Sequence, residues 1–196
     1  MNSLLVPLET RERHVIRSGT GIVGGVLLAR AGIVVDFDEN PDPYLEVLAN
    51  VRQRLEWEDV WSTHTILKAV RGATDRSIPY DPRGYQRTLR QEAERIGVDN
   101  LTPENQIGLS QFMESGGICH QWALVGATTI ELLQRGGELS GSVSLESGQP
   151  NEAHPDRHVM VDFTEAGQEQ TYTLSINGGL YPPFDPAPLT HAAPIR

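Results

Sequence analysis

Gly117-Ile118-Cys119-His120-Gln121-Trp122-Ala123-Leu124 begins the most informative segment of the chain. From here apolar side chains recur at helical spacing, and Gly136-Gly137 is a typical helix stop. This pattern predicts a helix from Cys119 to about Gln134, with Cys119 on its first turn. The side chains expected on its inner face are Trp122, Ala123, Ala127, Ile130 and Leu133.

Cys119 is the only cysteine of the chain, so any chemistry there is that of a lone thiol. Unpaired N–H groups and the macrodipole at a helix N-terminus favour negative charge and lower the pKa of a thiol. Gly116 and Gly117 would let a substrate carbonyl approach closely, and the Cys119 N–H could donate to an oxyanion. We therefore predict a nucleophilic thiol. The alternative is a buried structural cysteine, which is what most lone cysteines are.

A general base for this thiol has to come from elsewhere in the chain, and His158 has the best position. It begins an apolar strand that follows the turn-forming residues His154-Pro155-Asp156. His120 is a rival base, but neighbours on a helix point about 100 degrees apart, so its ring would face away from Cys119. Alternation predicts one strand face with Val159, Val161 and Phe163 toward the core, and an opposite face with His158, Met160 and Asp162.

This order of helix, strand and histidine resembles the core of the transglutaminase-like cysteine hydrolases, which are papain-like Cys-His-Asp/Asn thiol enzymes. The upstream helix over 66–70, followed by Ile78-Pro79-Tyr80-Asp81-Pro82, is similar to the helix and "I-x-Y-D" stretch before the cysteine of that family. The resemblance covers roughly residues 60–178. It implies an α+β fold in which helices pack on an antiparallel sheet, with the cysteine at a helix N-terminus and the histidine on a strand.

Members of that family have a catalytic triad whose third residue is usually an Asp on the strand after the histidine. The sequence departs from the family at this third position. Here the corresponding strand is Thr171-Tyr172-Thr173-Leu174-Ser175-Ile176-Asn177. We predict that Asn177 orients His158 by accepting from its ring N–H, as in Cys-His-Asn sites. Asp162, on the same strand face as His158, is the charged alternative. We assign Gly117, Trp122 and Gln111 to substrate binding, with Gln111 as a second oxyanion donor.

The activity expected from this site is hydrolysis or acyl transfer on peptide or glutamine-type amide bonds, through a thioester on Cys119. Cell-wall peptidases with a Cys helix and a His strand are the nearest enzymatic rivals. A non-catalytic binding module of the same fold is an alternative of another class. A second alternative is dinucleotide binding, because 19–24 match G-x-G-x-x-G and Asp36 or Asp38 follows at the distance of a ribose-binding acid.

Composition restricts the other classes of function. The 196 residues include 16 basic and 26 acidic side chains, giving a formal charge of -10 that repels phosphate backbones. We therefore expect a peptide or protein substrate and no nucleic-acid partner. A single cysteine excludes an internal disulfide. Because the histidines also lack the spacing of metal ligands, we expect no metal site, and we expect no cofactor. The apolar run over 19–31 is too short to span a bilayer, so we expect no membrane association and a cytoplasmic location.

The remaining pattern predicts a single domain over 1–178, with its core at about 60–178, an N-terminal extension over 1–59 and a Pro-rich tail over 179–196. The apolar runs over 22–28 and 33–37 are expected to be strands joined by a turn at Ala31-Gly32, and they could add to the C-terminal sheet. Trp57 and Trp61 are predicted to be core or interface anchors on a helical stretch. Further helices are expected over 44–55, 60–70, 83–96 and 102–113, and strands over 141–145, 157–163 and 171–176.

Overall fold

The computed structural model describes residues 16–17, 22–23, 26–27, 32–99, 101–102, 104–148, 158–168 and 171–176. The fold is α+β, as the sequence predicts. In chain order the elements are β1 (Ile16–Arg17), β2 (Ile22–Val23), β3 (Val26–Leu27), β4 (Gly32–Val34), α1 (Asp42–Leu55), α2 (Thr63–Ser77), α3 (Pro82–Ile96), β5 (Gln106–Gly108), α4 (Ser110–Ser115), α5 (Cys119–Arg135), β6 (Gly141–Gly148), β7 (His158–Glu165) and β8 (Thr171–Leu174).

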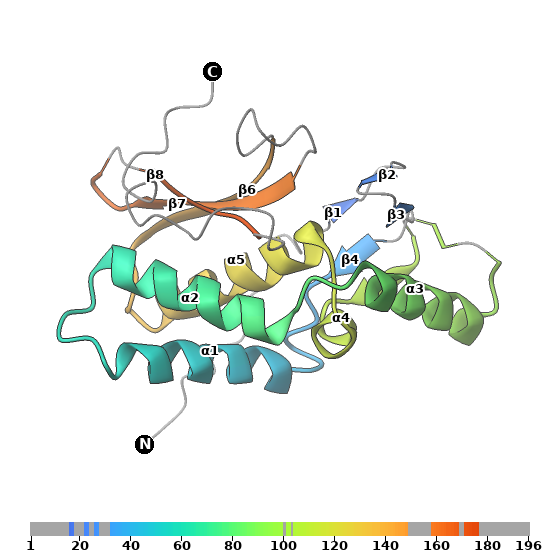
Figure 1. Ribbon diagram of the computed structural model, residues 1–196, viewed down its shortest axis with the longest axis horizontal. Helices are drawn as coiled ribbons and strands as arrows, with labels where there is room; N and C mark the ends of the chain where they lie inside the picture. The colour runs from blue at the N-terminus through green and yellow to red at the C-terminus, as the bar shows by residue number, and fades with distance from the viewer. Residues whose placement is uncertain are drawn as a thin grey trace.

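Helix α5 is the centre of the molecule. It packs against α1 and α2 on one side and against β6 and β7 on the other, so that the sheet and the two helices form layers around it (Figure 1). Because α5 is covered on both sides, nearly all of its side chains are buried, including Leu124 and Val125, which the predicted inner face did not contain. The helix is therefore a core helix and not an amphipathic surface helix.

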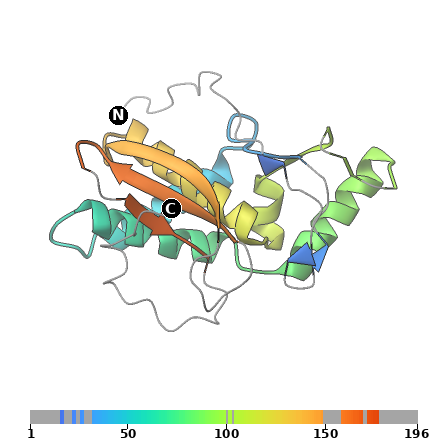
Figure 2. The ribbon, with the colours of Figure 1, turned by 90° about the horizontal axis from the view of Figure 1, so that it is seen from above.

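The C-terminal sheet has the order β6-β7-β8 and is antiparallel throughout. Strand β6 pairs with β7 from Gly141↔Glu165 to Gly148↔His158, and β7 pairs with β8 from Val161↔Leu174 to Thr164↔Thr171. Figure 2 shows the sheet from above, lying across α5. This confirms the three predicted strands and the packing of the Cys119 helix against them.

The N-terminal strands do not join that sheet, contrary to the expectation. Strand β4 pairs with β1 and, in parallel, with β5, which makes a separate sheet of order β1-β4-β5. The predicted run over 22–28 is divided into β2 and β3, which pair with each other as an antiparallel hairpin. Gly32 is the first residue of β4 and pairs with Arg17, so it does not form the predicted turn with Ala31, which lies outside the described residues.

The helix predicted over 102–113 is wrong in its first half. Residues 106–108 form β5, because their backbone groups pair with β4, and only Ser110–Ser115 is helical. The expected helix cap is instead a local turn, in which the Asn105 side chain accepts from the Thr102 N–H at 2.7 Å. Pro103 lies outside the described residues. Helix α2 begins later than predicted, with Ser62 accepting from the Thr65 N–H, and continues to Ser77.

A half-buried carboxylate joins the end of β4 to two helices. Asp36 accepts from the Tyr44 hydroxyl of α1 at 2.6 Å and from the Ser110 N–H of α4 at 3.0 Å. Burial, reinforced by Asp36, raises the pKa of Tyr44, so its hydroxyl stays protonated as a donor. The region predicted to be an N-terminal extension therefore contributes α1 and β4 to the same packed core.

Among the described residues, no helix has both the length and the apolar composition needed to cross a bilayer.

Candidate active site

Cys119 is the first residue of α5, as predicted, and its side chain lies between that helix and the start of β7. The backbone N–H of Val159 in β7 is directed at Sγ, together with the N–H groups of His120 and Cys119 itself. The side chain is 3% exposed. Sγ is thus at a helix N-terminus and next to the residue that follows His158, but it is covered in this conformation.

The pKa of the Cys119 thiol is raised, which is opposite to the prediction. Burial is the largest cause, because it removes water from the thiolate, and the three backbone N–H groups only partly offset it. A helix N-terminus is visible in the sequence, whereas the burial of Sγ depends on tertiary packing. In this conformation the group is a thiol at neutral pH.

His158 is the first residue of β7, also as predicted, and its backbone pairs with Gly148. Its side chain lies outside the described residues. The strand faces are not as expected, because Met160 is 2% exposed although it lies on the face opposite Val159 and Val161. Both faces of β7 are therefore covered at that point, and the predicted open face is wrong there.

Asp162 lies further along β7, and its carboxylate accepts from the Thr173 hydroxyl of β8 at 2.7 Å. His158 and Asp162 are four residues apart on one strand, which corresponds to about 13 Å between their Cα atoms at 3.3 Å per residue. That span exceeds the combined reach of the two side chains. Asn177, the other predicted orienting residue, lies outside the described residues.

The backbone before Cys119 is held by the segment that precedes α3. Gly117 donates its N–H to the Pro79 carbonyl at 3.1 Å and accepts from the Asp81 N–H at 2.9 Å, which forms a parallel bridge between Tyr80 and Gly117. Gly116 has φ 89° and ψ 158°, a conformation essentially limited to glycine. Gly116 therefore permits the sharp turn just before α5.

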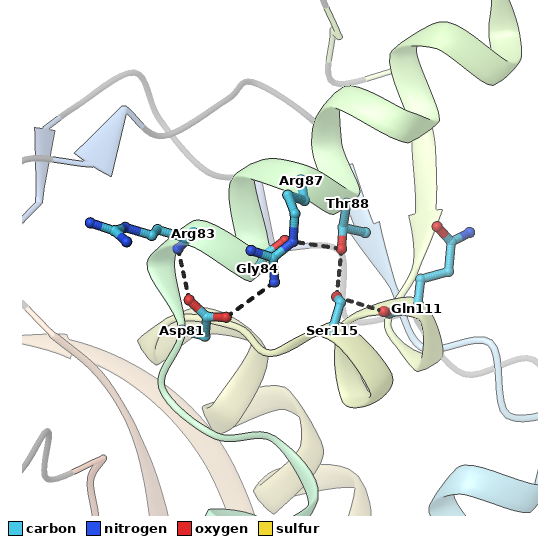
Figure 3. A network of polar contacts seen from close by, with 7 residues as sticks. All are labelled: Asp81, Arg83, Gly84, Arg87, Thr88, Gln111 and Ser115. Carbon is cyan, nitrogen blue, oxygen red and sulfur yellow. Dashed lines mark hydrogen bonds and ion pairs between the residues drawn. The ribbon is translucent and has the colours of Figure 1, made fainter.

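Side chains of α3 and α4 fix that turn from the other side, as Figure 3 shows. Asp81 caps α3 by accepting from the Arg83 N–H at 3.0 Å, and its pKa is lowered mainly by the backbone N–H of Gly84. The hydroxyls of Thr88 and Ser115 are hydrogen-bonded to each other. At Gly84, an added Cβ would lie 1.9 Å from the Ser115 carbonyl oxygen, so α3 is in direct backbone contact with this segment.

The predicted substrate-binding residues do not gather at one place. Gln111 is exposed on α4, its carbonyl accepts from the Ser115 hydroxyl, and in Figure 3 its amide points away from the network. Trp122 is buried in the core, and its indole N–H donates to Asp75 of α2 at 2.8 Å. Of the three, only Gly117 is adjacent to the Cys119 turn.

Gln121 is a residue that the sequence reasoning missed. Its side-chain oxygen accepts from the Ile118 N–H at 3.0 Å and so satisfies the N-terminus of α5 next to Cys119. A Gln three residues after a helix N-cap is half of a capping box, and that signal could have identified it. Tyr80 and Asp81 were noted only as part of the family motif, and the bridge to Gly117 is the reason for their position.

Dinucleotide binding, the second alternative, receives no support from the geometry. The residues after Gly21 form the β2–β3 hairpin, whereas a dinucleotide fingerprint needs a helix beginning at its glycines. Asp36 was a predicted ribose ligand, but its carboxylate already accepts hydrogen bonds from Tyr44 and Ser110. Within the described ranges, no three His, Cys, Asp or Glu side chains converge as metal ligands would.

The chain was compared with protein-family models, with curated proteins and with solved structures, and none of them matches it. Functional inference therefore rests on the geometry around Cys119.

Proposed function

We propose that the chain is a thiol-dependent hydrolase or acyl transferase with a transglutaminase-like core, acting on peptide or glutamine-type amide bonds. One observation carries the proposal: the first residue of α5, Cys119, lies against the first residues of β7, where His158 directly precedes the Val159 N–H that points at Sγ. A nucleophile and a base can exchange a proton directly when they begin two rigid elements that pack side by side with their first residues adjacent.

The chemistry follows from these positions. His158 takes the thiol proton while Sγ attacks the amide carbonyl carbon, and the N–H of Cys119 donates to the developing oxyanion. The amine then leaves with the proton returned by the imidazolium, and a thioester remains. Water ends the cycle by hydrolysis, or a substrate amine ends it by transamidation.

The raised thiol pKa sets a condition on this mechanism. Because the resting thiol is protonated and 3% exposed, proton transfer has to accompany attack, and a substrate reaches Sγ only when its surroundings open. The same observation favours a second candidate, a non-catalytic binding module in which Cys119 is a small apolar core residue.

For the orienting residue, the position of Asp162 along β7 argues against that side chain. The pairing of β7 with β8 ends at Val161↔Leu174 and does not extend to position 158. Asp162 is about 13 Å away along the strand and already accepts from Thr173. We therefore keep Asn177 as the proposed partner of His158.

The experiment that tests the function is mass spectrometry of a peptide pool incubated with the protein. Cleaved peptides, a gain of about one dalton at glutamine, or cross-linked pairs would identify hydrolysis, deamidation or transamidation, since all three share one thioester. Cys119→Ala has to abolish the product, and Lys68→Ala, at an exposed position of α2, controls for general effects of substitution. If wild type and Cys119→Ala give the same spectrum, the binding-module candidate replaces the enzyme.

Variants of Asn177 and Asp162 test which of the two side chains orients His158. Asn177→Ala is expected to lower turnover about 10-fold or more, since the base loses its orienting partner, while Asp162→Ala has little effect. Each variant is checked for an unchanged unfolding midpoint, so that a lower rate is not a loss of folded protein. The reverse order of effects would assign the role to Asp162.

A further inference from the structure

The loop between α1 and α2 exposes large apolar side chains. Trp57 is 87% exposed, Val60 72% and Trp61 47%, all within five residues. The loop lies at one end of the molecule in Figures 1 and 2, at the far end of α5 from Cys119. The two tryptophans were predicted to be anchors on a helix, but this segment is a loop and they are not in the core.

The loop is held in its shape by the helices beside it. The Trp61 indole N–H donates to the Leu55 carbonyl at 3.0 Å, and the Glu58 N–H donates to the same carbonyl at 3.1 Å. Ser62 caps α2 by accepting from the Thr65 N–H. A partner that covers Trp57 therefore does not have to order the loop first, which lowers the entropic cost of binding.

The charge around these side chains is acidic. Glu56, Glu58 and Asp59 are all exposed, and in the described part of the chain none of their carboxylates has a hydrogen-bond or ion-pair partner. Arg54, on the preceding helical turn, donates to the Gly72 carbonyl at 3.0 Å. The loop thus presents an indole face and three carboxylates together, and both attract guanidinium and ammonium groups.

We propose that this loop, residues 56–61, is a docking surface for a partner protein segment that carries arginine or lysine beside apolar side chains. Trp57 is the anchor, and apolar side chains and a stacked guanidinium of the partner segment cover its indole. Glu58 and Asp59 pair with the partner's remaining cationic groups. A second copy of this chain does not fit, because two such loops would bring like charges together in a protein of formal charge -10. An anionic bilayer is disfavoured for the same reason.

The test is fluorescence anisotropy of a labelled amphipathic helical peptide of leucine and arginine, titrated with the full chain. Wild type is expected to bind it, and Trp57→Ala to weaken binding about 10-fold or more, since an anchor residue is lost. Glu58→Gln with Asp59→Asn is expected to weaken binding about 3-fold at low salt, with a smaller effect at high salt. Leu45→Ala, which alters an exposed apolar residue on α1, is the matched control and should bind as wild type.

Three results would overturn the proposal. These are equal binding by wild type and Trp57→Ala, equal binding of a peptide of leucine and glutamate, and absence of binding to the arginine peptide. Sedimentation of the same variants, alone and with vesicles of anionic phospholipid, tests the two other occupants, a second copy of the chain and a bilayer. A Trp57-dependent dimer or Trp57-dependent vesicle binding would assign the loop to a second copy or to a bilayer instead.

Discussion

Two opposing effects act on the Cys119 thiol. The helix N-terminus and the Val159 N–H favour the thiolate, while burial among α5 and β7 favours the neutral thiol, and burial is the larger effect. A residue at a position typical of nucleophiles can therefore be unreactive at rest. Reactivity at this site depends on how often Sγ meets water or substrate.

The first prediction concerns alkylation of Cys119. With iodoacetamide, the native protein should react slowly at neutral pH, and the rate should reach half of its maximum at a pH above the ordinary thiol value of 9.0. The sign follows from burial, since a raised pKa leaves less thiolate at any lower pH. The urea-unfolded protein is the control and should show the ordinary value. A native midpoint below 9.0 would show that Sγ is solvated and stabilised as thiolate.

The second prediction uses two glycines with positive φ. Gly116→Ala should lower the free energy of unfolding by about 3 kcal/mol, because the backbone conformation is essentially limited to glycine. The added Cβ would also lie 2.7 Å from the Asp81 Cβ. Gly97 has φ 72°, and no atom lies within 4 Å of a Cβ added there, so Gly97→Ala should lower the free energy of unfolding by only about 1 kcal/mol. Urea titration measures both, and equal costs would mean that Asp81 moves aside.

At the scale of elements, a polar contact joins α5 to α2 within their apolar interface. The Trp122 indole N–H donates to Asp75, and Asp75 also faces Arg71. Burial lowers the pKa of Arg71, and the Asp75 carboxylate only partly offsets this effect. Replacing Asp75 therefore removes both a charge and an acceptor. Two variants separate these contributions.

The third prediction compares Asp75→Ala with Asp75→Asn. Both remove the charge beside Arg71, but Asn keeps an oxygen that can accept from the Trp122 indole. Asp75→Ala should therefore be less stable than Asp75→Asn by about 1 kcal/mol, the usual net value of a hydrogen bond. Chemical denaturation of the pair gives the difference. Two identical midpoints would mean that water replaces the lost acceptor.

Helical periodicity was sufficient to predict most of the helices. The spacing of Tyr44, Val47 and Val51 predicted α1, and the glycine pair after α5 predicted its end. The periodicity failed over 102–113, because pairing of β5 with a strand 74 residues earlier is not visible in a local window. It also wrongly placed Trp57 and Trp61 on a helix, because α1 ends at Leu55 and α2 begins only at Thr63. Cys119 and its helical position were predictable, but its burial by β7 was not.

At the scale of the molecule, α1 belongs to the same core as the candidate site. Four of the side chains that it buries are at most 1% exposed: Tyr44, Val47, Val51 and Leu55. At about 1.5 kcal/mol or more for each, they contribute about 6 kcal/mol, which is comparable with the whole stability of a domain. The resemblance to thiol hydrolases covers roughly 60–178 only, so it leaves out part of what holds Cys119 in place.

The fourth prediction follows from this. A chain of residues 60–178 should lack a cooperative thermal transition, and residues 32–178 should regain one, because the shorter chain loses the helix that covers α2 and α5. Circular dichroism during heating measures both. A sharp transition of residues 60–178 at an unchanged midpoint would show that α1 is dispensable.

The parallel pairing of β4 with β5 has a consequence for synthesis on the ribosome. Gly32 and Asp36 need partners, Gln106 and Ser110, that are translated 74 residues later. At about 5–20 residues per second, the nascent chain waits on the order of 4–15 s with the edge of β4 that faces β5 unpaired. An apolar strand edge left open for that time is a site for chaperone capture or misassociation. Slower codons between 36 and 106 would lengthen this interval, and faster ones would shorten it.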